Sequence, residues 1–226
     1  PERAHDRRQG SGQGYGGGYG VKTCLIIGNG PSLADIPNEF LENYPTFGSN
    51  RVYLKYTPDY YACVDPINLS QKHIEEIKAL NCTKYIDISQ AHLIPGSTPL
   101  QCIHEMGFSY SPMDYVYAYF SVTTVLLQLA YFYGFDEIGL VGMDHRWITD
   151  AGARDWYINT GKDKNHFTPE YYQPGARWKA PFLSKLEAWY GLSKIVYCSA
   201  NKRIVNLTPN SALDVFERED WQSWEK

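Results

Sequence analysis

The sequence lacks the features that place a protein in a membrane or in the secretory pathway. It has no apolar run long enough to span a bilayer, and its N-terminus is polar and Gly-rich rather than basic and then apolar. The five cysteines are odd in number, widely spaced and mostly set in apolar runs, which indicates neither a disulfide framework nor a CxxC metal pair. We therefore expect buried thiols, a reducing compartment and a cytoplasmic protein.

The sequence also lacks a strong charge of either sign. Its 21 Lys and Arg and 25 Asp and Glu residues give a formal net charge of −4. Without a basic surface, neither nonspecific DNA binding nor attraction to an anionic bilayer is favoured. The 226 residues, 43% of them hydrophobic, are enough for one full core. We expect one domain with no nucleic-acid partner and no integral membrane segment, and a homo-oligomer stays open.

Three motifs of known chemistry are also missing. There is no Asp-x-Asp pair, which many glycosyltransferases use to hold a divalent ion, and no Gly-Lys-Ser/Thr of a P-loop. In the one Gly-x-Gly turn that follows an apolar run, Leu33 stands where a dinucleotide fingerprint has its third glycine. These absences weigh against ATPase and hydride-transfer chemistry. They predict that an activity here needs no metal and no cofactor.

What is present is an alternation of strand and helix patterns. Residues 1–20 mix Arg, Gln and Gly without apolar periodicity, which predicts a flexible tail. The remainder, 21–226, predicts a single Rossmann-like α/β domain with a doubly wound, mostly parallel sheet. The expected strands are 21–27, 46–49, 60–64, 84–88, 137–141 and 203–207, and the expected helices are 69–80, 121–133 and 181–198.

Between residues 146 and 180 the periodicity disappears while Trp, Tyr, Asn, Gly and Pro accumulate. A connection of this length is unusual in a compact domain unless it has a function. We expect an irregular lid, and we call residues 146–180 the lid segment.

A Gly-Asn-Gly-Pro-Ser-Leu turn follows the first apolar run. Its glycines permit a close backbone approach, its serine can cap the next helix, and the start of that helix offers free N–H groups to a phosphate. The alternative is a tight strand-to-helix corner without a ligand. We predict that the turn binds a nucleotide, with contacts from Gly28, Asn29, Gly30, Pro31 and Ser32.

Other polar residues are placed where chemistry is possible. Asp144 ends a second apolar strand and could bind a ribose or sugar hydroxyl, bind a metal, or cap a loop. His166 lies in the lid segment, where it could be a general base or only brace a loop. Ser121 marks a helix start facing the expected cleft. Arg146 and Tyr157 could stabilise a phosphate, although aromatic packing alone explains much of this segment.

Taken in order, these motifs resemble the bacterial sialyltransferases of glycosyltransferase family forty-two and the related MptE-like domains. The resemblance spans roughly residues 21–216 and ends in a Pro-Asn-Ser turn. It implies that Asn29 and Asn50 contact the nucleotide CMP and that Ser121 reaches the donor sugar nucleotide. It also implies that His166 is the catalytic base of the lid.

The sequence departs from this family at the phosphate site. Asp65 stands where the family has an asparagine before a proline, and a carboxylate near a phosphate is unfavourable unless it binds a hydroxyl. The family's phosphate-binding tyrosines are not clearly matched, since His145-Arg146-Trp147 stands at the first place and Trp156-Tyr157 only loosely at the second. The basic C-terminal tail of the family is absent.

The resulting hypothesis is an inverting, metal-independent glycosyltransferase that takes a CMP-activated acidic sugar as donor and a glycan as acceptor. The first alternative is an MptE-like pyrophosphokinase that acts on hydroxymethylpterin with ATP and Mg²⁺, in which Asp65 and Asp144 would hold the metal. The second alternative is a noncatalytic nucleotide-binding module.

Overall fold

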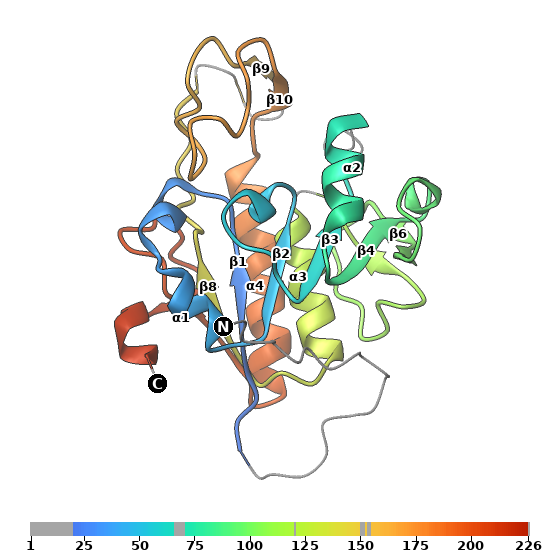
Figure 1. The fold of residues 1–226 in the computed structure, drawn as a ribbon. Helices are drawn as coiled ribbons and strands as arrows, with labels where there is room; N and C mark the ends of the chain where they lie inside the picture. Colours follow the sequence, from blue (N-terminus) through green and yellow to red (C-terminus); the bar gives the residue numbers. More distant parts are fainter. Residues whose placement is uncertain (1–19, 66–70, 120, 150–151, 153–154, 226) are drawn as a thin grey trace, which may run out of the picture.

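A computed structural model describes residues 20–65, 71–119, 121–149, 152 and 155–225, and Figure 1 shows its arrangement. Apart from Gly20, the tail expected at 1–20 lies outside the described residues. The first residues of the helix expected at 69–80 lie outside them as well.

The centre of the molecule is an eight-stranded sheet in the order β12-β11-β8-β1-β2-β3-β4-β5. Every pairing in it is parallel, which confirms the prediction of a doubly wound, mostly parallel sheet. The strands are β1 (Thr23–Ile27), β2 (Thr46–Ser49), β3 (Tyr60–Cys63), β4 (Thr83–Asp87), β5 (Thr98–Leu100), β8 (Glu137–Val141), β11 (Arg203–Asn206) and β12 (Glu217–Arg218).

Both faces of the sheet are covered, which explains the continuous apolar run of β1. Cys24 and Ile26 belong to one core cluster, and Leu25 and Ile27 belong to the other, as the alternation of side chains in a strand requires. Helices α3 and α4 cover the first face, while η1, α1 and α2 cover the second. These helices are α3 (Val122–Phe132), α4 (Leu183–Ser199), η1 (Pro31–Asp35), α1 (Asn38–Glu42) and α2 (Gln71–Ala79).

Further short elements complete the described chain. None of its helices has the length and apolarity needed to cross a membrane. Two small sheets lie outside the central one: β6 with β7 is parallel, and β9 with β10 is antiparallel. Their bounds, with those of the remaining 3-10 helices, are β6 (Cys102–Ile103), β7 (Val116–Tyr117), β9 (Trp156–Ile158), β10 (Arg177–Lys179), η2 (Val52–Leu54), η4 (Ala91–Leu93) and η5 (Trp221–Trp224).

The lid segment is less irregular than expected, because β9 and β10 pair within it as a two-stranded ribbon. In Figure 1 this ribbon stands beyond the ends of the central strands, on the side where β1 leads into η1. Each strand has only three residues, which is too short for a period of two to be recognised in the sequence.

The prediction of buried thiols is correct for three of the five cysteines. Cys24, Cys63 and Cys102 are buried, and Cys82 is half-buried. The prediction is wrong for Cys198, which is exposed in the last turn of α4. The apolar residues next to Cys198 in the sequence lie on other faces of the helix, so their burial does not predict that Cys198 is buried.

Candidate active site

A cavity of about 550 Å³ lies at the carboxyl ends of the central strands. β1 and β8 are neighbours in the sheet, and the chain order proceeds from them in opposite directions, which is where ligands of open α/β sheets bind. The lid segment forms part of the wall. Most of the predicted site residues line this cavity together, namely Gly28, Asn29, Gly30, Asn50, Asp65, Ser121, Asp144, Arg146 and His166.

The glycines of the first turn are required by the protein's own backbone. A Cβ atom on Gly28 would lie 2.4 Å from the carbonyl oxygen of Gly142, and one on Gly30 would lie 2.0 Å from Oδ2 of Asp144. The N–H groups of the two glycines donate to the carbonyls of Val141 (2.8 Å) and Gly142 (2.9 Å). The close approach predicted for a ligand is therefore made by the turn after β8.

Asp144 also accepts from one amide at the start of η1, that of Ser32. Its Oδ1 accepts from the Ser32 N–H at 3.1 Å, and its Oδ2 accepts from the Ser32 hydroxyl at 2.8 Å. The expectation that Ser32 caps the helix is wrong, because the N-cap is Gly30, which has no side chain to cap with. The expectation of a free amide at Ser32 is also wrong, because Asp144 accepts from it. Ser32 and Pro31 are not among the residues that line the cavity.

The Pro-Asn-Ser turn near the C-terminus holds the chain after β8 in place. The N–H of Met143 donates to Oγ1 of Thr208 at 2.9 Å, and the hydroxyl of Ser211 donates to the Met143 carbonyl at 2.6 Å. The N–H of Ala212 donates to the carbonyl of Asp144 at 2.9 Å. The turn therefore fixes the backbone that carries Asp144 toward the cavity.

Ser121 is placed as predicted. It is the N-cap of α3, and its hydroxyl oxygen accepts from the N–H of Thr123 at 3.1 Å. The side chain stands on the cavity wall, next to Tyr190, with whose hydroxyl it also forms a hydrogen bond.

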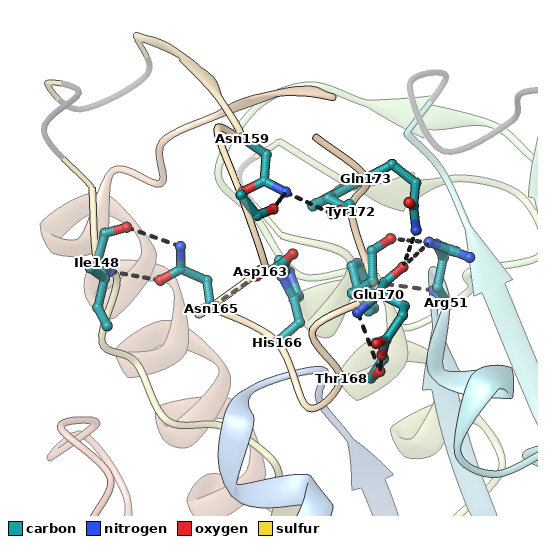
Figure 2. Close-up of polar contacts among 12 residues, drawn as sticks. Arg51, Ile148, Asn159, Asp163, Asn165, His166, Thr168, Glu170, Tyr172 and Gln173 are labelled. Carbon is teal, nitrogen blue, oxygen red and sulfur yellow. Dashed lines mark hydrogen bonds and ion pairs between the residues drawn. The ribbon is translucent and has the colours of Figure 1, made fainter. Parts of the chain in front are cut away.

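His166 is braced by a carboxylate that the sequence pattern did not reveal. Its Nδ1 lies 2.9 Å from Oδ2 of Asp163, and the two side chains are only 8% and 4% exposed. An ionised carboxylate can only accept, so Nδ1 carries the proton in this contact and Nε2 is the basic nitrogen. The signal for Asp163 was its position three residues before the histidine in the same loop. Figure 2 shows both residues in the lid segment.

The ionised state of Asp163 is favoured by its contacts. Burial of the carboxyl opposes ionisation, but the hydrogen bond and charge interaction with His166 lower the pKa of Asp163, as do hydrogen bonds from the backbone of Asn165 and Tyr172. The net result is a pKa below the ordinary value. The carboxylate is therefore charged at neutral pH and can stabilise an imidazolium.

Aromatic rings fix the plane of the His166 imidazole. It stacks on Tyr171 with ring centroids 3.8 Å apart and an interplanar angle of 4°. Trp147 and Tyr172 meet it edge to face at 5.6 and 5.2 Å. Tyr171 is itself buried, so the imidazole has little freedom to rotate away from the cavity.

Hydrogen bonds join the lid segment to the first turn and to the chain just after β2, and others close the segment on itself; several are drawn in Figure 2. The N–H of Phe167 donates to the carbonyl of Asn29 at 3.1 Å, next to the first turn. The buried guanidinium of Arg51 donates to the carbonyl of Tyr171. The Asn165 side chain accepts from the N–H of Ile148 at 2.6 Å and donates to its carbonyl at 3.0 Å. The segment is thus held over the first turn.

Tyr157 and Asn29 differ in whether they reach the cavity. Tyr157 is not among the residues lining it, because β9 directs its ring against Trp178, with the two ring centroids 4.7 Å apart. Asn29 is on the wall, and its Nδ2 donates to the carbonyl of Ser49 at 3.2 Å. Within the described chain, the buried Oδ1 of Asn29 has no hydrogen-bond partner, which leaves an acceptor for a ligand hydroxyl or amine.

Comparison of the sequence with protein-family models gave no match, and comparison with curated proteins gave none. Among solved structures, the chain is similar to the MAf glycosyltransferase from Magnetospirillum magneticum AMB-1, with a TM-score of 0.57 and 16% sequence identity. The match covers 89% of this chain and 34% of that one, so this chain spans about a third of its length. The likeness shows a shared Rossmann-like α/β fold, and the resemblance to sialyltransferases stays an expectation drawn from the motifs.

Proposed function

We propose that the chain is an inverting glycosyltransferase that uses a CMP-activated acidic sugar, needs no metal, and has His166 as its general base. The observation that carries the proposal is His166 on the wall of a cavity at the switch point of the sheet, with the buried carboxylate of Asp163 behind it. The shared fold with the MAf glycosyltransferase is consistent with it.

In the proposed reaction, Nε2 of His166 removes the proton from an acceptor hydroxyl. The acceptor oxygen then attacks the anomeric carbon from the face opposite the phosphate, and the bond from that carbon to the phosphate oxygen breaks. CMP leaves with the electron pair of that bond, and the configuration of the sugar inverts. Asp163 stabilises the imidazolium that forms, which is the role of the third group in a catalytic triad.

The leaving phosphate needs positive charge or donors, and the Ser32 amide does not supply them because Asp144 accepts from it. Arg146 is the cation on the cavity wall that we assign to the phosphate, assisted by the Ser121 hydroxyl. The acceptor atom Oδ1 of Asn29 and the carboxylate of Asp65 suit hydroxyl or amino groups of the donor, and Asn50 completes the nucleotide side.

The test is transfer from CMP-sialic acid to a panel of glycan acceptors. We expect His166→Ala to abolish transfer while the variant keeps its circular dichroism spectrum and still unfolds cooperatively, at a lower melting temperature because Asp163 loses its buried partner. The matched control is His92→Ala, because His92 is exposed on η4 and does not line the cavity. Unchanged transfer by His166→Ala would remove the proposed base.

The pyrophosphokinase alternative has one observation in its favour, since Asp65 and Asp144 line the same cavity. Among the described residues, however, no three His, Cys, Asp or Glu side chains come together as a metal-binding group. A thermal shift with CMP against ATP plus Mg²⁺ separates the two, because a ligand that binds the native state raises its melting temperature. Stabilisation by ATP and Mg²⁺ alone would favour the alternative, and CMP binding without transfer to any acceptor would favour a noncatalytic module.

A further inference from the structure

The β9–β10 ribbon has two different faces. The register pairs Arg177 with Ile158, Trp178 with Tyr157, and Lys179 with Trp156. Side chains alternate across a strand, so the middle pair points to one face and the two outer pairs point to the other. The face of the middle pair is turned toward the protein, since Trp178 is buried. The outer pairs form the outward face, which we call the ribbon ledge: Trp156, Ile158, Arg177 and Lys179.

The ribbon ledge combines an exposed aromatic ring with two cations. Trp156 is 47% exposed and Ile158 is 52% exposed. The guanidinium carbon of Arg177 lies 4.8 Å from the centroid of the Trp156 ring, and Nζ of Lys179 lies 5.2 Å from it. The two cations beside this ring concentrate positive charge next to its exposed face.

The ledge is continuous with the candidate active site. Lys179 and Trp178 line the cavity, so the ledge begins at the cavity wall. On the inward face, the ring of Trp178 packs against that of Trp147, with centroids 5.3 Å apart. The ring of Trp147 in turn packs against the His166 imidazole, with centroids 5.6 Å apart. The ribbon is therefore packed on the same aromatic group that holds the proposed base. A molecule lying on the ledge would reach into the cavity from the side of His166.

We propose that the ribbon ledge is the acceptor subsite and that it binds a glycan whose terminal sugar carries a carboxylate. This rests on the proposed function of the adjoining cavity. The apolar C–H face of a pyranose packs on an indole ring, and a guanidinium or ammonium group beside the ring pairs with the carboxylate of an acidic sugar. A neutral glycan would gain only the first of these interactions.

Charge complementarity supports an anionic occupant. The whole chain has a formal net charge of −4, whereas the ribbon ledge has two cations and no acidic residue. Within the part of the chain that the structure describes, neither Arg177 nor Lys179 forms a salt bridge. A carboxylate on the acceptor would supply the missing partner.

The experiment compares two acceptors that differ in one acidic sugar, 3′-sialyllactose and lactose. Trp156→Ala and the double variant Arg177→Gln/Lys179→Gln are tested against the control Lys72→Gln/Lys78→Gln, which removes the same charge from α2. We expect both ledge variants to raise KM for sialyllactose by about tenfold or more. We expect the double variant to raise KM for lactose much less than it raises KM for sialyllactose.

Calorimetric titration of sialyllactose, without any donor, tests the subsite independently of transfer. Binding by the wild type and the α2 control that is lost in both ledge variants supports the proposal even if no transfer is found, in which case only the proposed function fails. Equal affinity in wild type and ledge variants overturns the subsite, and so does a KM that is unchanged by the substitutions. Equal effects of the double variant on the acidic and neutral acceptors would also overturn it.

Discussion

Replacing Asp163 by asparagine tests the physical basis of the site. The substitution keeps the size and shape of the side chain but replaces one acceptor oxygen by an NH₂ group. In the wild type, one carboxylate oxygen accepts from His166 Nδ1 at 2.9 Å and the other accepts from the Asn165 N–H at 2.8 Å. An amide can satisfy only one of these two donors without rearrangement, so either the imidazole or the loop backbone loses its partner.

The expected cost follows from these two contacts. A hydrogen bond to a charged group contributes about 1.5–3 kcal/mol, and an unsatisfied buried donor costs about 1–3 kcal/mol. The side chain is only 4% exposed, so solvent compensates little. We expect Asp163→Asn to lower the free energy of unfolding by about 2–4 kcal/mol at pH 7.

The difference between wild type and variant should depend on pH in a definite direction. The pKa of Asp163 is lower in the folded protein than the ordinary value, which is about 3.9 in an unfolded chain. Its ionisation therefore stabilises the fold in full above that value, and this stabilisation is lost as the pH falls through the folded pKa. Asparagine does not titrate. The gap should thus close as the pH falls below about pH 4.

Urea unfolding followed by tryptophan fluorescence at several pH values measures this gap. The same variant should lose most of its transfer activity, and Asp163→Glu, which keeps the charge, should recover part of it. No gap at pH 7, or a gap that stays the same down to pH 3, would contradict the conclusion that an ionised Asp163 carboxylate holds the imidazole and the loop backbone.

Three further outcomes are expected from substitutions in the fold. Gly30→Ala should lower the free energy of unfolding in urea by at least about 1–3 kcal/mol, because its Cβ would lie 2.0 Å from Oδ2 of Asp144. The control Gly191→Ala, in α4 where a Cβ meets no other atom, should raise it by about 0.5–1 kcal/mol. Equal effects of the two substitutions would refute the steric argument. Arg51→Met should make the lid segment more sensitive to limited proteolysis, and unchanged cleavage would show that this anchor is dispensable. Ser121→Ala should cost about 1 kcal/mol as a lost N-cap.

The elements that the sequence predicts well are those whose environment is uniform along their length. β1 is recognised because both of its faces are buried, and α3 because it has an apolar pattern and a serine at its start. Strands β5 to β7, β9 and β10 have two or three residues each, too few to show a period. The topological switch point follows from the order of the strands and not from any one of them.

Most of the predicted site residues line the cavity, but Pro31, Ser32 and Tyr157 do not, and the contacts within the site were not predictable. His166 stands out because a histidine in an aperiodic segment has no helix or strand face to pack on. Ser32 and Asp144 were each recognised as candidates, but the bond between them joins positions 112 residues apart, and no local pattern reports it. Asp163 was missed because its role depends on the loop folding back so that its carboxylate meets the imidazole, which spacing alone does not show.

The contact between Asp144 and the first turn has a consequence for recognising such proteins. The turn after β1 already binds an anion of its own chain, the Asp144 carboxylate. This carboxylate is held there at a high effective concentration, so a free phosphate would have to displace it. The Gly-Asn-Gly-Pro-Ser-Leu turn and the Gly-Met-Asp turn therefore form one hydrogen-bonded unit. A chain that had only one of the two turns would have an amide or a carboxylate without its hydrogen-bond partner. The two motifs should therefore be sought together when this fold is assigned.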